Sequence, residues 1–431
     1  MKIIQICPGS GDNFYCENCL RDAALVKALR GLGHDVLMVP LYLPLQADKV
    51  EPVSNAPLFF GGVNVYLQQK LSLFRKTPRW IDRWFDSRGL LEWAGRKAGM
   101  TSARDLGETT ISMLQGEHGR QVKELDRFVD WLVTEPEKPD VVCLSNVLLA
   151  GMARRIKERL AVPVVCLLQD EDGFLDGLTS PYAERAWAVV RERARDIDAF
   201  LAVSQYYADA MQERLQADSS RMHVVHMGVE MGMYTPGDSG PVTPTIGFLS
   251  RMCPQRGLET LIDAFLLLKR NSELGSAKLR ISGGRSAADE PFISRLRDKL
   301  AAAGVLDDVE FLAAFDRDAR LEFLRGLSVL SVPEASPVAY GLYVLEALAM
   351  GVPVVEPAIG CFPEVIALTG GGILYEPNTP ERLAEVLEPL LLDSQAARKL
   401  GAEGRAGMLR AFDIARTAKE LVGVYERVVR R

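Results

Sequence analysis

Short apolar runs that alternate with helical stretches are the sequence feature that most constrains the fold. Near the start, Lys2–Ile6 reads as a buried strand, and an amphipathic helix over about 19–32 leads to a second strand at 36–39. The same alternation returns at Asp140 and continues to residue 225. Strands and helices that alternate in this way build doubly wound sheets with helices on both faces. The sequence therefore predicts an α/β architecture made of Rossmann-like units.

A stretch rich in proline and glycine divides the chain into two regions. Thr235–Pro244 contains three prolines and two glycines, a composition that no regular element accommodates. A chain of 431 residues fits two domains of about 200 residues each. We expect a first Rossmann-like domain over 1–237, with an irregular insertion at about 41–130. A second Rossmann-like domain follows over 238–412, and a C-terminal helix occupies 413–431.

Composition and charge exclude several classes of protein. The net charge is −6, with 25% charged and 48% apolar residues, which describes a soluble globular protein and indicates no nucleic-acid partner. No apolar run approaches the roughly 18–20 residues of a membrane span, and the first residues lack a signal-peptide core. We therefore expect a cytoplasmic protein without a transmembrane segment, for which peripheral membrane contact stays open.

The seven cysteines are odd in number and scattered, which indicates reduced thiols and not a disulfide framework. Cys7, Cys143 and Cys166 lie in strand-like apolar runs and are interpreted as small buried side chains. Cys16 and Cys19 form a C-x-x-C pair in a loop, where a redox pair or half of a metal site is the alternative to a loop-shaping role. No second C-x-x-C is present to complete a zinc site.

The stretch 334–357 carries the strongest functional signal. It reads as a loop rich in small residues and proline, then a short helix that begins near Gly341 and Leu342, a stop at Gly351, and a buried strand at 352–355. One carboxylate, Glu346, lies inside this helix. Backbone N–H groups at a helix start hold phosphate oxygens, and a carboxylate one turn later accepts hydrogen bonds from ribose hydroxyls. The pattern outlines a nucleotide-sugar site.

Tyr340–Val355, with the sequence YGLYVLEALAMGVPVV, resembles a motif of the retaining GT-B glycosyltransferases, the family 4-like enzymes (glycosyl transferases group 1) that include sucrose and trehalose-type synthases. Their pattern contains two glutamates separated by seven residues. The second glutamate corresponds to Glu346, and the first falls on Val338. The resemblance implies a GT-B fold, in which two Rossmann-like domains face each other across a cleft. It also implies a nucleotide sugar on the second domain and an acceptor on the first.

The sequence Ser250–Gly257 matches the same family's S-R-x-x-x-x-K-G motif, with Arg251 on the arginine and Arg256 on the lysine. Two cations at a strand end, beside a helix N-terminus, hold a diphosphate and stabilise it as it leaves, without a metal. We interpret Arg251 and Arg256 as the catalytic and diphosphate-binding residues. The alternative is a surface pair held by salt bridges. The resemblance implies no cofactor and no metal, because the nucleoside diphosphate sugar is a substrate.

Residues of the first domain are further candidates for binding the nucleotide sugar or the acceptor. Gly9 and Gly11 follow the first strand and allow the backbone to come close to a ligand. Gln169, Asp170 and Asp172 follow the strand at 162–168 and are the candidate acceptor or sugar residues. In many relatives the residue at about Gln169 is a histidine that contacts the transferred sugar.

The acidic run 170–176 that starts in this loop has two interpretations. It binds acceptor hydroxyls or a cation, or it is a solvated loop that caps the next helix.

The resemblance implies a glycosyltransferase that moves a hexose from a nucleoside diphosphate sugar to an unknown sugar, lipid or small-molecule acceptor, with retention of configuration and without a metal. In relatives the first motif glutamate contacts the donor sugar, which Val338 cannot do. Glu334 lies four residues earlier, in a loop that is able to bring it in. One alternative is a non-catalytic homologue that binds a nucleotide sugar or glycan. Another is a thiol- or metal-dependent regulatory protein centred on Cys16 and Cys19.

Overall fold

The computed structural model describes residues 1–8, 17–41, 59–60, 103–237, 240–312 and 316–430. The chain divides into two compact units. The first unit is Met1–Val225 with Thr417–Arg431, and the second is His226–Arg416. Gly9, Gly11 and Cys16 lie outside the described residues, as does most of the predicted insertion.

The first unit contains a parallel sheet of six strands in the order β2-β1-β3-β4-β5-β6. Its strands are β1 (Lys2–Cys7), β2 (Asp35–Pro40), β3 (Val141–Leu144), β4 (Val164–Leu168), β5 (Ala199–Ala202) and β6 (Met222–Val224). β1 pairs with β2 on one side and with β3 on the other. The order therefore reverses between β1 and β3, and ligands of doubly wound sheets bind at the carboxyl ends of such strands.

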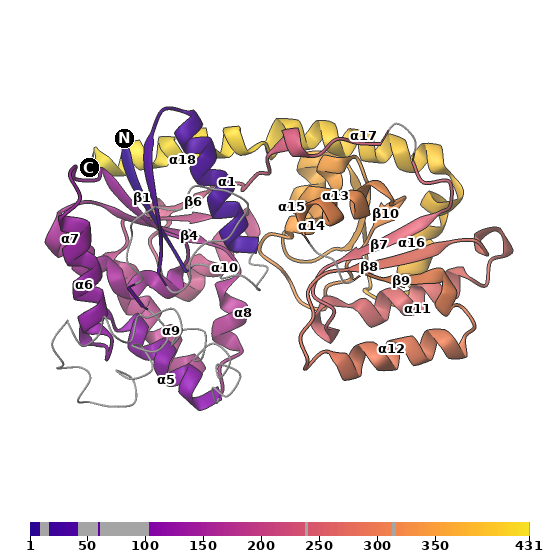
Figure 1. Cartoon of the computed structure of the whole chain (residues 1–431), viewed down its shortest axis with the longest axis horizontal. Coiled ribbons are helices and arrows are strands. Elements are labelled where there is room, and N and C mark those ends of the chain that lie inside the picture. Colours follow the sequence, from indigo (N-terminus) through magenta and orange to yellow (C-terminus); the bar gives the residue numbers. More distant parts are fainter. Residues whose placement is uncertain (9–16, 42–58, 61–102, 238–239, 313–315, 431) are drawn as a thin grey trace. The chain divides into compact units, whose positions relative to one another are not determined.

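Helices cover both faces of this sheet, with α1 and α18 on one face and α7 and α9 on the other (Figure 1). The helices are α1 (Glu17–Gly31), α5 (Ala103–Leu114), α6 (Val122–Val133), α7 (Ala153–Leu160), α8 (Glu171–Asp176), α9 (Tyr182–Arg193), α10 (Gln205–Leu215) and α18 (Ile414–Val429). The buried residues of α6 include Leu125, Phe128, Val129 and Leu132, which form one apolar stripe. The sequence therefore gives the helix a single core-facing side.

The second unit repeats the plan with a sheet in the order β12-β11-β10-β7-β8-β9, again with parallel pairs. Its strands are β7 (Thr245–Leu249), β8 (Lys278–Ser282), β9 (Val309–Phe311), β10 (Val329–Leu330), β11 (Val354–Pro357) and β12 (Gly372–Tyr375). The order reverses between β7 and β10. The loops that follow these two strands therefore meet at the carboxyl edge of the sheet.

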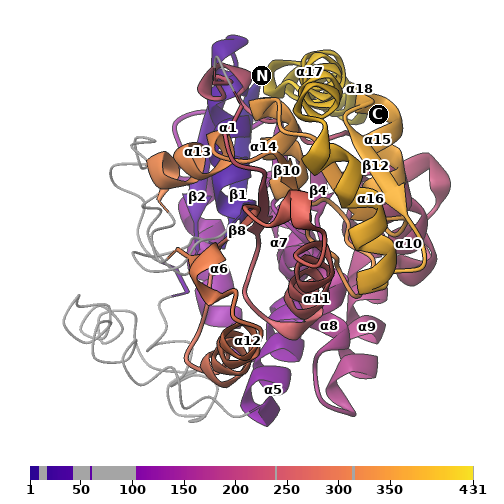
Figure 2. The same cartoon turned by 90° about the vertical axis from the view of Figure 1, so that its right-hand side faces the viewer.

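Figures 1 and 2 place α11 and α12 on one face of the second sheet and α14 and α15 on the other. The helices are α11 (Leu258–Leu268), α12 (Glu290–Ala302), α13 (Arg317–Arg325), α14 (Leu342–Met350), α15 (Phe362–Thr369), α16 (Pro380–Leu392) and α17 (Ser394–Ala411). α16 packs on α11, and α17 packs on α14 and α15.

One predicted strand differs from the structure for a local reason. The strand predicted at 352–355 begins two residues later, because the Gly351 and Val352 N–H groups still bond to carbonyls of α14. In the first unit, a 3-10 turn over Val147–Met152 precedes α7, which begins at Ala153.

Cys7, Cys143 and Cys166 are fully buried in or at the ends of strands, which confirms their interpretation as small core residues. Within the described ranges, no helix is both long and apolar enough to cross a membrane.

Candidate functional site

The loops after β7 and β10 lock together at the reversal point of the second sheet. The Ala335 N–H donates to the Gln255 carbonyl at 3.0 Å. Gly257 has φ +70°, and a Cβ at this position would lie 1.8 Å from the Pro333 carbonyl oxygen. Only glycine combines this backbone conformation with such a close approach. The two loops therefore form one rigid edge from which side chains project.

Four helices of this unit, α11, α12, α14 and α15, begin without a side-chain cap, and two of them directly follow a glycine in a left-handed conformation. These glycines are Gly257 before α11 and Gly341 before α14. Glycine has no side chain with which to cap the first-turn N–H groups, and the helix dipole adds partial positive charge there. These N-termini suit an anionic group such as phosphate. Gly341 and Leu342, predicted from sequence to bind a ligand, lie at the start of α14.

Arg256 belongs to a cluster that we call the Arg256 triad, formed with Glu334 and Tyr343. Nη1 of Arg256 donates to Oε1 of Glu334 at 2.8 Å, and the Tyr343 hydroxyl donates to the same oxygen at 2.9 Å. The Arg256 side chain is 33% exposed, whereas Glu334 is 2% exposed. The buried Glu334 carboxylate therefore anchors a guanidinium that is partly exposed to solvent. Glu334 does enter the candidate site, but it does so beneath Arg256.

Arg251 is held by the loop that follows β8. Its Nε and Nη2 lie 3.1–3.2 Å from the Asp289 carboxylate oxygens, and Ser286 donates its N–H and hydroxyl to Asp289 Oδ2. Burial alone would raise the pKa of Asp289, but the Ser286 bonds and Arg251 outweigh it, and the pKa is lowered. Nη1 of Arg251 has no partner among the described residues. Both predicted cations thus carry a carboxylate partner and sit on the same loop.

Glu346 belongs to a second cluster, the Arg320 triad, formed with Arg320 and Tyr234. The Tyr234 hydroxyl donates to Oε1 at 2.8 Å, and Nε of Arg320 lies 2.9 Å from the same oxygen. Oε2 of Glu346 has no partner among the described residues. Glu346 is 2% exposed, and this burial raises its pKa against the opposing effects of Arg320 and Tyr234.

Val338 lies where the family motif has its first glutamate. Its carbonyl accepts a hydrogen bond from the Cys361 N–H at 3.0 Å, and a Cβ at Gly360 would lie 2.5 Å from the Val338 nitrogen. Val338 is itself buried. The residue therefore fixes this loop against the turn before α15, and it presents no polar atom from its side chain.

In the first unit, Gln169 lies at the carboxyl end of β4 and is 1% exposed. Its Nε2 donates to the carbonyl and the hydroxyl of Ser145, which follows β3. Its Oε1 is buried and has no partner among the described residues. The side chain thus lies beside the reversal point of the first sheet.

The acidic run that follows is not the predicted loop, because it forms α8 from Glu171 to Asp176. Asp170 is exposed and takes a left-handed conformation at φ +76°. Asp172 is half-buried and its Oδ1 lies 3.0 Å from the Tyr207 hydroxyl. In the described parts of the chain, no group of three or more acidic, histidine or cysteine side chains has a geometry that holds a metal ion.

Glu171 was not predicted from the sequence, yet it is the central buried group of this turn. Its carboxylate accepts hydrogen bonds from the N–H groups of Val147 and Gln169 at 3.1 and 2.7 Å. The Tyr207 hydroxyl adds a third bond at 2.9 Å. Burial raises the pKa of Glu171 to about 7 despite these bonds. Glu171 therefore ties β3, β4 and α10 together.

Two family models match the chain, one for each unit. Residues 240–407 match the model described as glycosyl transferases group 1, and residues 23–228 match the glycosyl transferase 4-like domain. The chain belongs to this glycosyl transferase family.

Similar proteins agree with this assignment. The D-inositol 3-phosphate glycosyltransferase of Mycobacteroides abscessus is 28% identical over 246 residues, which is 54% of this chain and 53% of that protein. The Jonesia denitrificans protein of the same name is 28% identical over 243 residues, 53% of this chain and 57% of that protein. The chain thus spans little more than half the length of these relatives.

Anabaena HepE, crystallised with UDP and glucose, has a TM-score of 0.70 and 15% identity to this chain. The likeness covers 99% of this chain and 100% of HepE. At this identity it shows the fold alone, and it confirms the predicted GT-B fold class.

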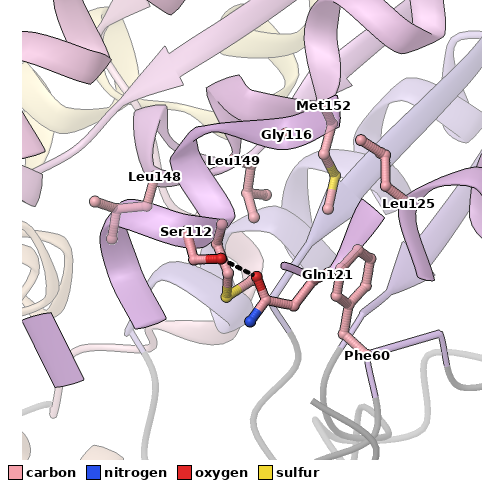
Figure 3. A pocket seen from close by; sticks show the side chains of 9 residues that line it. Phe60, Ser112, Gly116, Gln121, Leu125, Leu148, Leu149 and Met152 are labelled. Atoms are coloured by element: carbon pink, nitrogen blue, oxygen red, sulfur yellow. Dashed lines mark hydrogen bonds between the residues drawn. The ribbon is translucent and has the colours of Figure 1, made fainter. Parts of the chain in front are cut away.

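One pocket in the first unit is separate from the predicted residues (Figure 3). Its volume is about 10 Å³, which is room for about one water molecule. Most of its lining is apolar, and Ser112 donates a hydrogen bond to Gln121 Oε1 at 2.6 Å. The pocket is too small for a sugar.

The sequence prediction missed Arg320, a residue of the second unit. The sequence nevertheless contains a signal that indicates its role. The buried residues of α13 are Arg320, Phe323 and Leu324, at the spacing i, i+3 and i+4 of a core-facing stripe. An arginine on such a stripe needs a carboxylate partner. The sequence therefore marks Arg320 as paired, although it does not identify Glu346 as the partner.

Proposed function

We propose that this protein transfers a hexose from a nucleoside diphosphate sugar to a sugar, lipid or small-molecule acceptor, with retention of configuration and without a metal. The observation that carries this proposal is the pair Arg251 and Arg256 on one loop at the reversal point of the second sheet. Two uncapped helix N-termini begin in the loops of the same edge. Such an arrangement suits a diphosphate, and HepE, which shares the fold, was crystallised with UDP.

In the proposed reaction the bond from the anomeric carbon to the diphosphate oxygen breaks, and negative charge develops on the leaving phosphate. Arg251 and Arg256 stabilise that charge because their carboxylate partners already hold them in place. The acceptor oxygen forms its bond to the anomeric carbon on the face from which the phosphate leaves. The leaving phosphate oxygen takes the acceptor proton on that face, which accounts for retention. Glu346 binds the ribose, and Gln169 with Asp170 and Asp172 lines the acceptor or sugar side.

A second candidate function is binding without turnover. Val338 favours it, because a buried aliphatic side chain occupies the position of the family's sugar-contacting glutamate. Losing one such contact typically removes about 2–4 kcal/mol of transition-state stabilisation. That loss slows a reaction greatly without abolishing it, so the two candidates differ in turnover and share the same donor site.

Calorimetric titration with UDP, ADP and GDP and with their hexose conjugates tests the proposal, followed by an assay for released nucleotide. Arg251→Ala is the test variant. Arg295→Ala is its matched control, because Arg295 is equally exposed at 59% against 57% and pairs with Glu259 on the same unit's surface. We expect only Arg251→Ala to weaken binding.

Three outcomes separate the candidates. A conjugate that binds tighter than its diphosphate and releases nucleotide supports the transferase. Binding without release supports the binding homologue. If no member of the panel binds, both candidates are wrong.

A further inference from the structure

We propose that Arg320 is a positioning residue for nucleotide recognition, which holds Glu346 so that its Oε2 accepts a hydrogen bond from a ribose hydroxyl. This inference rests on the proposed function, because it takes Glu346 as the ribose ligand. It adds two residues, Arg320 and Tyr234, that neither the motif nor the family models single out.

The geometry of the Arg320 triad fixes one carboxylate oxygen and leaves the other. Oε1 of Glu346 has the Tyr234 hydroxyl at 2.8 Å and Arg320 Nε at 2.9 Å. These two contacts come from different elements, since Arg320 lies on α13 and Tyr234 follows a 3-10 turn at Met231–Met233. A carboxylate held at one oxygen from two directions cannot rotate freely. Oε2, which has no partner among the described residues, is the oxygen left for a ligand.

The charge of Glu346 also depends on Arg320. Burial favours the protonated form of Glu346 and raises its pKa, while Arg320 and the Tyr234 hydroxyl bond lower it. Arg320 is the cation among the groups that act on this carboxyl within the described structure. A carboxylate is a stronger acceptor for a hydroxyl than a carboxylic acid. Arg320 therefore opposes the protonation that burial favours, and it shifts Glu346 toward the form that binds ribose.

Arg320 itself is not placed to contact a phosphate. Its side chain is 9% exposed, compared with 33% for Arg256 and 57% for Arg251. It thus acts through Glu346, and its loss should change what the protein recognises on the ribose while the diphosphate contacts stay intact.

The test measures ribose preference, defined as the affinity for UDP divided by the affinity for 2′,3′-dideoxy-UDP, with ADP and GDP pairs in parallel. A hydrogen bond to a charged group predicts a preference of about tenfold or more in the wild type. In Arg320→Met we expect the preference to fall close to one. Arg320→Lys, which keeps the charge, should retain part of it.

The pH profile provides a readout that a purely structural role would not move. In Arg320→Met, Glu346 loses its cation and its pKa rises further, so the ribose preference should recover as the pH is raised across the range in which the protein stays folded. The wild-type preference should stay constant over the same range. Arg325→Met is the matched control, because Arg325 lies on the same helix, is exposed, and bonds to the Thr235 carbonyl.

The outcomes distinguish this inference from the proposed function. If the wild type binds none of the diphosphates, both are wrong. If it binds them and Arg320→Met keeps the wild-type preference, the inference is overturned and the proposed function stands, even if the variant is less stable. If Arg320→Met does not fold, Arg320→Lys and Tyr234→Phe apply the same test, and an unchanged preference in both overturns the inference.

Discussion

The Arg256 and Arg320 triads use the same three residue types with opposite orientation. In each, one glutamate oxygen has a tyrosine hydroxyl and an arginine nitrogen within 2.9 Å. In the Arg256 triad the cation is one-third exposed and the carboxylate lies below it. In the Arg320 triad the cation is buried, and one oxygen of the carboxylate has no partner in the described part of the chain. The same three residue types therefore present a cation to a ligand in the Arg256 triad and an anion in the Arg320 triad.

The backbone decides which member is presented. Arg256 ends a 3-10 turn in the loop after β7, where its side chain is one-third exposed. Arg320 lies on the core-facing stripe of α13, so its charge stays inside. A third carboxylate, Glu171, accepts a bond from Tyr207, and no arginine of the described residues is among the main causes of its pKa shift. Its pKa is raised to about 7, which shows what a buried glutamate becomes without a cation.

Removing the carboxylate of each triad tests the comparison, and it should give the largest effect. Glu346→Ala leaves the buried guanidinium of Arg320 without its carboxylate and should lower the free energy of unfolding by about 3–5 kcal/mol. Glu334→Ala leaves a guanidinium that water reaches, and should cost about 1–2 kcal/mol. Urea unfolding of the two variants beside the wild type measures the difference. An equal or reversed order would show that the burial of the arginine does not distinguish the triads.

The pH dependence of stability tests the contrast between Glu171 and the glutamates of the two triads. Its pKa is raised from 4.5 to about 7 in the fold, so its stabilisation is complete below pH 4.5 and is lost as the pH rises to about 7. The loss is on the order of 3 kcal/mol. The stability gap between the wild type and Glu171→Gln should therefore shrink over this range. Unfolding measured at several pH values checks it, with the exposed Glu192→Gln as control, and a gap independent of pH would contradict it.

Diphosphate binding tests whether Arg256 presents its charge to a ligand. Arg256→Ala should weaken UDP binding by about 100-fold, because a hydrogen bond to a charged group contributes about 1.5–3 kcal/mol. The double variant Arg256→Ala with Glu334→Ala should regain stability, because no buried carboxylate is left alone, but it should not regain affinity. Melting temperature and calorimetry measure the two effects. Recovery of affinity in the double variant would show that Arg256 is structural.

The tyrosines should give the smallest effects. Tyr343→Phe and Tyr234→Phe each remove one hydroxyl bond to a buried carboxylate and should cost about 1 kcal/mol of stability. Tyr182→Phe is the control, because its hydroxyl lies 3.5 Å from Glu108 and its bond is weak. Thermal unfolding of the three variants gives the values. A larger loss for Tyr182→Phe than for the other two would mean that the tyrosines do not anchor the triads.

Much of this fold follows from local pattern, whereas the triads do not. The β-α alternation and the position of Arg251 and Arg256 after β7 are read from contiguous residues. The partners of these cations lie 38 and 78 residues further along the chain. Their identity depends on how the loops after β8 and β10 meet, and no local signal gives that. Likewise Glu171 reads as one more surface acid in the acidic run, because only the packing of α10 makes it buried.

The path of the chain through the units has a consequence for its synthesis. The second unit is one continuous segment, whereas the first needs Thr417–Arg431, whose Leu421, Val424, Tyr425 and Val428 are all buried. A ribosome makes these residues after the whole of the second unit. The second unit is therefore complete before the N-terminal unit, whose core, although most of it is synthesised earlier, waits for α18.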